Sequence, residues 1–279
     1  MKKIVVATDF SENSKKGILF SMQLAKQMDC ELIFYNVIQI YQPTIWDQTY
    51  YNVYQDDELQ RCQEIMDNFI ARMIEDNNID VFNFKCVCEI GITASDEIIS
   101  FAIKSRADYI AVSTVGSGKW TQIFGTTASE LIAFSTIPVL IIPKNYTVRP
   151  ITDLFFASDF VNLDDEIHEI SFFSNAINAN LDIFHFDYQS VIDSNENKFD
   201  KFNSKYKSDK LDFHLRNLDS GDPLIKQLEI EITKSEPSLV VVFTKQNRNW
   251  FDRLVLSSLS EDLAFDTKTP MLVFKKNLK

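Results

Sequence analysis

Short apolar runs alternate with amphipathic segments along the first half of the chain. Five runs have the continuity of buried parallel strands: Ile4–Ala7, Leu32–Val37, Val81–Cys88, Tyr109–Thr114 and Val139–Ile142. Between them, apolar residues recur at helical spacing and predict four helices: Ser11–Met28 with Ser11 as N-cap, Glu58–Asp76, Ala94–Lys104 and Thr126–Phe134. This alternation predicts an α/β domain whose parallel sheet has helices on both faces.

The second half of the chain repeats this pattern. Ala157-Ser158-Asp159-Phe160 matches Ala7-Thr8-Asp9-Phe10 at an offset of 150, and the same offset pairs Leu32-Ile33-Phe34 with Asp182-Ile183-Phe184. The offset falls to 130 at Gly221 and Thr244 and is 132 at Pro270. Constant offsets over whole strand–helix units indicate a tandem duplication. We therefore expect two domains, 1–146 and 151–279, joined by a linker that contains Pro150.

The change of offset means that the first repeat carries about 20 additional residues after its second strand. They include an aromatic-rich stretch, 38–57, which holds Tyr41, Trp46, Tyr50, Tyr51 and Tyr54. The pattern predicts a long loop, and a long loop is uncommon unless it covers something. Two interpretations stay open, a lid over a ligand or an apolar contact with the other repeat or another subunit, and we favour the contact.

Composition and charge exclude several classes of function. Hydrophobic residues make up 45% and charged residues 24% of the 279 positions, as in an ordinary globular protein of about two domains. The formal net charge of −12 argues against nucleic acid and anionic membranes as partners. The N-terminus runs directly into a strand, and no run of about 18 apolar residues occurs, so we expect a cytoplasmic protein.

The chain offers few residues for catalysis or metal binding. The cysteines contain no C-x-x-C pair, and we expect buried thiols in a reducing cytosol: Cys30, Cys62, Cys86 and Cys88. The three histidines, His168, His185 and His214, lack metal-ligand spacing to one another, and no nucleophile-elbow motif occurs. We therefore predict no catalytic residue and no metal site.

Glycine is scarce, so its distribution is informative. The chain has 6 glycines, whereas an average usage of about 7% would give roughly 20. Gly116, Gly118 and Gly125 lie in one loop after the predicted fourth strand, and Thr126 begins the next helix. A flexible loop that leads into a helix N-terminus favours phosphate binding, and a plain turn is the alternative. The loop is not a Walker A motif, and no dinucleotide fingerprint follows the first strand.

Three segments together resemble the universal stress protein family. They are Thr8-Asp9-Phe10-Ser11, Gly91-Ile-Thr-Ala before the third helix, and Gly125-Thr126 thirteen residues before Pro138. Their order recurs over almost the whole chain, which resembles a tandem member of the family. The resemblance implies a five-stranded parallel sheet of order 3-2-1-4-5 in each repeat, with the two last strands meeting across a pseudo-twofold axis. It also implies a stress-response binding or regulatory module.

The nucleotide-binding branch of that family carries the motif G-x-x-G-x9-G-[ST], which the first repeat matches in part. Eight residues instead of nine separate Gly116 from Gly125, and Ser113 stands at the first glycine. The resemblance implies that Asp9 contacts a ribose and that the backbone of Val37 reads an adenine. Asp9 has a plainer interpretation as a turn residue or a helix-terminal charge. The predicted site for one ATP-like nucleotide comprises Asp9, Val37, Ser113, Gly116, Gly118, Gly125 and Thr126.

The corresponding loop of the second repeat contains no glycine from Thr244 to Ser258, and Ser257 stands in place of Gly125. Side chains at every position hinder close approach of the backbone to phosphates, so we interpret this repeat as a degenerate copy kept for packing. Two alternatives to a nucleotide-binding module stay open. One is a ligand-free interaction protein that acts through its paired sheets and the aromatic stretch; a homo-oligomer is a further partner that stays open. The other is a slow ATPase.

Overall fold

The computed structural model describes residues 1–80, 82–114, 126–188, 192–206, 208–218, 224–244 and 268–275. The chain divides into two compact units, and the division falls between Val148 and Arg149. The predicted loop glycines Gly116, Gly118 and Gly125 lie outside the described residues, as does most of the loop that follows Thr244.

The first unit is an α/β domain, as predicted. Its described strands are β1 (Lys3–Ala7), β2 (Glu31–Ile38), β3 (Phe84–Ile90), β4 (Tyr109–Ser113) and β5 (Val139–Ile142). Its described helices are α1 (Ser14–Met28), α2 (Gln48–Asp76), α3 (Ala94–Lys104) and α5 (Thr126–Phe134). The strand order is β3-β2-β1-β4-β5 and every pair is parallel, which confirms the predicted order 3-2-1-4-5.

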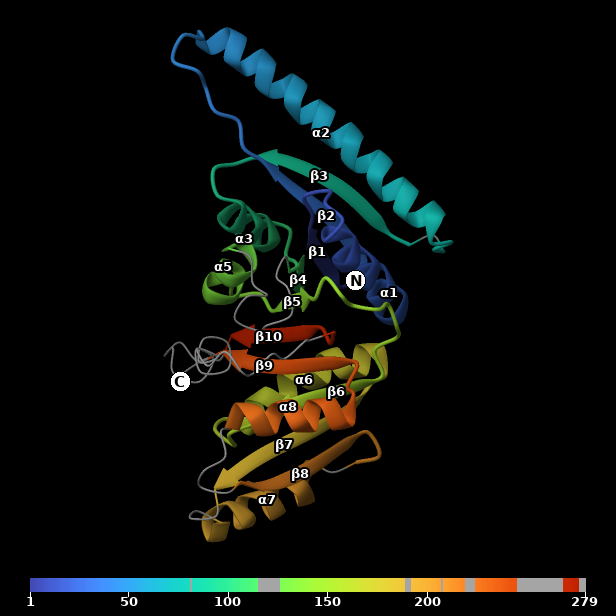
Figure 1. Ribbon diagram of the computed structural model, residues 1–279, viewed down its shortest axis with the longest axis vertical. Helices are drawn as coiled ribbons and strands as arrows, with labels where there is room; N and C mark the ends of the chain where they lie inside the picture. The colour runs from blue at the N-terminus through green and yellow to red at the C-terminus, as the bar shows by residue number, and fades with distance from the viewer. Residues whose placement is uncertain are drawn as a thin grey trace. The chain divides into compact units, whose positions relative to one another are not determined.

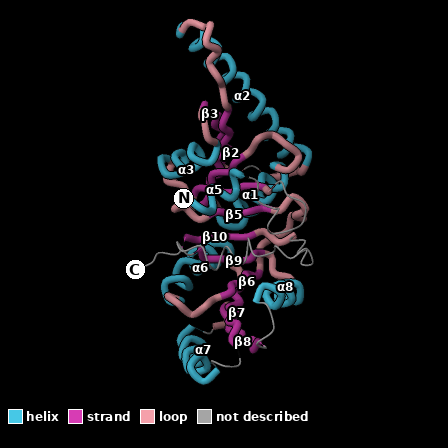
Figure 2. Tube along the Cα trace, turned by 60° about the vertical axis from the view of Figure 1, so that its left-hand side comes forward, coloured by secondary structure: helices cyan, strands magenta, loops and turns pink. Residues whose placement is uncertain are grey.

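Helices cover both faces of this sheet (Figures 1 and 2). Tyr35 and Asn36 are neighbours on β2 and therefore point to opposite faces. Tyr35 stacks on Phe101 of α3 with ring centroids 4.2 Å apart, whereas Asn36 contacts Cys62 of α2. Both faces of the central strands are therefore buried, which is why these strands are continuous apolar runs in the sequence.

The aromatic stretch is not a loop throughout. Helix α2 begins at Gln48, ten residues before the predicted start, and Asp47 caps it by accepting a 2.9 Å hydrogen bond from the Tyr50 N–H. Its buried residues lie between Cys62 and Met73, and its N-terminal part extends past the sheet (Figure 1). Periodicity does not predict this extension, because a helical segment without a core to face has no apolar stripe.

Two other boundaries differ from the prediction. Helix α1 begins at Ser14 instead of Ser11, so Ser11 is not its N-cap; its Oγ instead accepts from the Ser14 N–H at 3.3 Å within the preceding turn. Strand β3 is displaced toward the C-terminus, to Phe84–Ile90, where it pairs with β2.

None of the helices in the described ranges combines the length and apolar character that crossing a membrane requires.

The second unit has the same topology as the first. Its described strands are β6 (Asp153–Ala157), β7 (Asn180–Tyr188), β8 (Leu211–Leu218), β9 (Leu239–Thr244) and β10 (Met271–Lys275), in the order β8-β7-β6-β9-β10. Its described helices are α6 (Leu163–Ile177), α7 (Ile192–Tyr206) and α8 (Leu224–Ser235). Read from β8, the order again corresponds to 3-2-1-4-5, and the four neighbouring strand pairs are parallel.

Strand register corrects the predicted alignment of the two repeats. Ile4 pairs with Leu32 in the first unit, and its counterpart Leu154 pairs with Leu181, so Leu32 corresponds to Leu181 and not to Asp182. Helices α1 and α6 each have 15 residues and show the same offset of 149. One residue is therefore missing from the turn that precedes α6, and sequence comparison at an offset of 150 cannot detect it.

Candidate functional site

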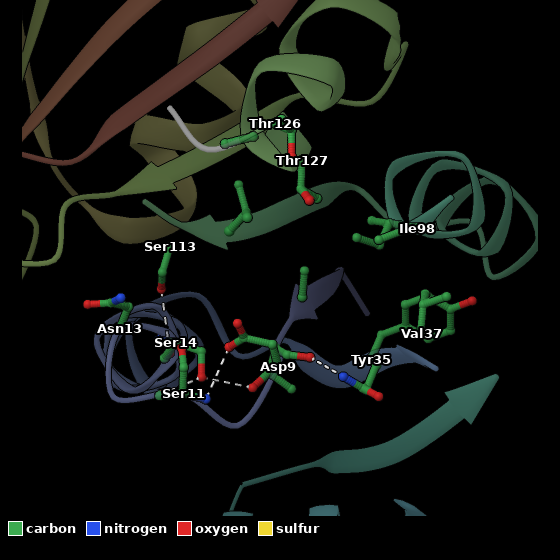
Figure 3. A pocket seen from close by; sticks show the side chains of 16 residues that line it. Asp9, Ser11, Asn13, Ser14, Tyr35, Val37, Ile98, Ser113, Thr126 and Thr127 are labelled. Carbon is green, nitrogen blue, oxygen red and sulfur yellow. Dashed lines mark hydrogen bonds between the residues drawn. The ribbon is translucent and has the colours of Figure 1, made fainter. Parts of the chain in front are cut away.

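A cavity opens in the first unit at the carboxyl ends of β1, β2 and β4 (Figure 3). Its volume is about 210 Å³, several times the roughly 30 Å³ that one water occupies in the liquid. Strand β1 pairs with β2 on one side and with β4 on the other, so the order of the strands reverses at β1. The cavity therefore occupies the switch point at which open parallel sheets bind ligands.

The four described residues of the predicted site line this one cavity, although they are distant in the sequence. Asp9 follows β1, Val37 lies on β2, Ser113 ends β4 and Thr126 begins α5. The N-terminus of α5 brings the first N–H groups of the helix and the positive end of its dipole to the edge of the cavity, where they favour an anion. The described lining contains no lysine or arginine, and within it backbone and hydroxyl groups are the donors available to an anion.

Asp9 forms part of a strained turn. Its Oδ1 accepts from the Ser11 N–H at 3.0 Å, and the Phe10 N–H donates to Thr8 Oγ1 at 3.2 Å. Phe10 has φ 62°, a left-handed conformation that is unusual for a bulky residue and that clusters at functional sites. The plainer role of Asp9 as a turn residue is therefore present. A carboxylate has further lone pairs, so the exposed side chain can also accept from a ligand hydroxyl.

A set of hydroxyl groups at the start of α1 makes the floor of the cavity polar. Thr8 Oγ1 donates to Ser14 Oγ at 3.1 Å, and Ser113 Oγ accepts from the Gly17 N–H at 2.9 Å. A Cβ at Gly17 would clash with Ser113 Oγ. Neither Ser14 nor Gly17 belongs to the site predicted from the sequence. The useful feature was a glycine inside a helix of a glycine-poor chain, because that position costs about 1 kcal/mol relative to alanine.

The opposite wall is apolar and comes from Tyr35, Val37 and Ile98. Gly91 lets this wall form, because a Cβ there would lie 2.9 Å from Val37 Cγ1. The Tyr35 hydroxyl donates to Glu89 at 2.7 Å, and burial together with this hydrogen bond raises the pKa of Tyr35, so the phenol remains neutral. A polar floor and an apolar wall suit a ligand with one flat apolar end and one anionic end.

The second unit keeps the turn but surrounds it with larger or charged residues. Phe160 has φ 61°, and Asp159 Oδ1 accepts from the Val161 N–H at 2.9 Å, as in the first unit. Register and helix length place different residues at three lining positions and at Gly17, which contacts Ser113: Leu163 for Ser14, Glu166 for Gly17, His185 for Asn36 and Phe243 for Ser113. All four are buried, and Phe160 stacks on His185 with ring centroids 3.9 Å apart.

The histidines have structural partners and do not line the cavity. His214 Nε2 lies 2.9 Å from Asp182 Oδ1, His185 Nδ1 lies 2.8 Å from the Ser158 carbonyl oxygen, and His168 packs edge-on against Phe172. Within the described ranges, no three acidic, histidine or cysteine side chains are grouped closely enough to hold a metal ion.

Comparison with known proteins identifies the family. The universal stress protein family model matches residues 1–143, about half of the 279, and the chain belongs to this family. A universal stress protein from Archaeoglobus fulgidus DSM 4304 superposes with a TM-score of 0.67 at 18% identity, covering 99% of this chain and 98% of that one. A candidate universal stress protein from Pseudomonas aeruginosa UCBPP-PA14 gives 0.61 at 12% identity, with coverages of 99% and 93%. At these identities the likeness concerns the fold. No curated protein matches the chain.

Proposed function

We propose that this universal stress protein binds one ATP-like nucleotide in the cavity of its first unit and acts as a binding module in the stress response. The observation that carries the proposal is the convergence of Asp9, Val37, Ser113 and Thr126 on one cavity. The adenine would lie on the wall of Tyr35, Val37 and Ile98, with the Val37 backbone reading its edge. The Asp9 carboxylate would accept from the ribose, and the phosphates would reach the N-terminus of α5 and the loop before it.

The contrast between the units supports a single site. The second unit retains Asp159, but it has a buried phenylalanine where the first has Ser113 and a buried carboxylate, Glu166, where the first has Gly17. A carboxylate repels phosphate, and a phenylalanine at the position of Ser113 is bulkier and has no hydroxyl group to donate. Asp159 alone does not provide a nucleotide site.

The described lining supports binding without turnover. Its titratable side chains are Asp9 and Tyr35, and Tyr35 stays neutral because burial raises its pKa. General acid–base catalysis requires a positioned group that changes protonation near neutral pH. We therefore expect ATP to bind and to remain intact, and phosphate release over hours would favour the slow ATPase instead.

Calorimetric titration of the full chain with MgATP tests the proposal, with MgGTP as the base-specificity control. We expect one site per chain, a preference for ATP, and about tenfold weaker binding by Asp9→Asn, because the turn persists while the charged acceptor for the ribose is lost. Asp159→Asn changes the equivalent turn of the second unit and should bind as the wild type does. Two equal sites, no binding, or equal losses in both variants would contradict the proposal.

An exposed apolar surface favours an interaction role as the second candidate. Ile45 is 89% and Tyr41 77% exposed, and Tyr50 and Val53 on the protruding part of α2 are also exposed. Apolar groups gathered in this way are uncommon on proteins that bind no partner. Sedimentation over a range of concentrations distinguishes the interaction role from the nucleotide-binding role, with Ile45→Glu and Val53→Glu as paired variants. Self-association that these changes abolish would support the interaction role.

A further inference from the structure

Two cysteines from different elements meet beneath α2. Cys62 lies on α2 and Cys88 on β3, and their sulfur atoms are 2.8 Å apart. Both side chains are buried, and all four cysteines of the chain are free thiols. The two residues are 26 positions apart in the sequence, so only the packing of helix on strand brings them together.

Gln63 holds the helix in this position. Its side-chain amide donates to the Cys86 carbonyl at 3.1 Å and accepts from the Cys88 N–H at 3.2 Å. Strand β3 is the outer strand of the first unit's sheet, and such strands present backbone groups that have no neighbouring strand. Because Gln63 follows Cys62 directly, its two hydrogen bonds fix Cys62 opposite Cys88.

The pair is reachable from solvent by a small oxidant. Cys62 lines a second hollow of the first unit, which is bounded by Phe10, Tyr41, Tyr54 and Arg61. Burial raises the pKa of both thiols, although a hydrogen bond with Cys88 partly lowers that of Cys62. The thiolate is the reactive form, so reaction at neutral pH will be slow and will begin at Cys62.

We propose that Cys62 and Cys88 are a modification site, a dithiol that hydrogen peroxide converts reversibly to a disulfide linking α2 to β3. The Cys62 thiolate attacks one peroxide oxygen; the O–O bond breaks, Cys62 becomes a sulfenic acid, and the other oxygen leaves as water after taking a proton. The Cys88 thiolate then attacks the Cys62 sulfur; the S–O bond breaks, the S–S bond forms and a second water leaves. The two thiols thus give two electrons and two protons to the peroxide.

Asn36 connects this pair to the nucleotide cavity. The Cys62 thiol lies 3.3 Å from Asn36 Oδ1, Asn36 Nδ2 donates to the Thr8 carbonyl at 2.6 Å, and both Asn36 and Thr8 line the cavity. A disulfide has no thiol proton, so oxidation removes the hydrogen bond that the Cys62 thiol donates to Asn36 Oδ1. The second unit has no equivalent device, because His185 stands for Asn36 and its register partner is Leu215, where Asn36 has Cys88.

Peptide mapping of the full chain tests the modification itself and needs no nucleotide. Reduced protein is treated with millimolar peroxide and then alkylated with maleimide under denaturing conditions. We expect two maleimide adducts in place of four, a mass lower by two hydrogen atoms before alkylation, a linked Cys62–Cys88 peptide, and full reversal by dithiothreitol. Four adducts, a Cys86–Cys88 link, or over-oxidised Cys62 without a link would overturn the proposal.

Cysteine variants provide the matched control. Cys86→Ser removes a third thiol on the same strand and should leave the link intact, whereas Cys62→Ser and Cys88→Ser should abolish it. Because the wild-type map already decides the question, a variant that folds poorly does not weaken the test. A link that persists in Cys62→Ser would contradict the assignment.

The effect of oxidation on the cavity is measured in separate experiments. The measurement of ATP affinity rests on the proposed function. The oxidised protein should bind ATP about fivefold more weakly than the reduced protein, the effect of losing one neutral hydrogen bond. Amide hydrogen exchange around Thr8 and Asn36 should also become faster on oxidation, whether or not ATP binds. Absence of ATP binding in both forms would refute only the proposed function, whereas unchanged exchange and affinity in disulfide-linked protein would refute the coupling.

Discussion

The two units share a topology and a turn but differ in what fills the end of the sheet. Both carry an aspartate that closes the turn after the first strand, and both hold the following phenylalanine at positive φ. In the first unit Ser14 and Ser113 line a cavity and Gly17 contacts Ser113, whereas the second unit buries larger or charged residues at those positions. A turn motif can therefore persist while the residues around it change, and the motif alone is a poor indicator of a site.

The proposed nucleotide site depends on open space and on the absence of a carboxylate where the phosphates would lie, so adding a negative charge there should have the largest effect. Thr126→Glu places a carboxylate at the N-terminus of α5, beside the expected phosphates. At about 5 Å and an effective dielectric constant of about 20 the repulsion is roughly 3 kcal/mol, which predicts at least a 100-fold loss of ATP affinity by calorimetry. Stability should not fall, because an acidic residue is favourable at a helix N-terminus.

Gln48→Glu is the matched control for this charge. It adds the same side chain at the start of α2, which lies outside the described lining of the cavity. Its ATP affinity should equal that of the wild type. Equal affinity losses in both variants would assign the effect to net charge instead of the cavity.

The next largest effect is on stability, and it concerns the contacts that hold α2 of the first unit against its sheet. In the first unit Gln63 makes two hydrogen bonds to the backbone of β3, so Gln63→Leu should lower the free energy of unfolding by about 2 kcal/mol in urea. Gln60→Leu removes a side chain whose amide donates to exposed Glu64 on the same helix, and it should cost less than about 0.5 kcal/mol. Similar costs for both would mean that Gln63 does not fix α2.

The smallest effect belongs to the second unit, where α7 is tied to α6 by exposed groups. Asp164 Oδ1 accepts from the Tyr206 hydroxyl at 2.5 Å and from Lys205 Nζ at 3.0 Å, and these bonds lower the pKa of Asp164. A lowered folded-state pKa means that this stabilisation is present above the ordinary carboxyl pKa and disappears as the pH falls through the folded value. Asp164→Asn should therefore lower the melting temperature by about 1–2 °C at pH 7 and leave it unchanged at pH 2.

Asp200→Asn, an exposed change on α7 itself, is the control and should have no effect at either pH. A loss for Asp164→Asn that persisted at pH 2 would show that packing, not charge, holds α7 to α6.

The sequence by itself determined the class of fold and the order of most elements. Buried parallel strands such as Val139–Ile142 must be continuous apolar runs, and helices such as Ala94–Lys104 must be apolar on one side, so both leave a pattern that can be read directly. The duplication was evident for the same reason, because each repeat has to bury the same faces. Asp9, Val37, Ser113 and Thr126 were available from family resemblance, since they lie at strand ends and a helix start.

Only the tertiary structure decided how distant residues meet. The residue missing before α6 is detected from strand register and not from composition. The exposed first turns of α2 lack the core contacts that give a helix its periodic apolar residues. The proximity of Gly17 to Ser113, and of Cys62 to Cys88, depends on how closely a helix approaches a strand. Such distances follow from packing among several elements at once, and no local stretch of sequence encodes them.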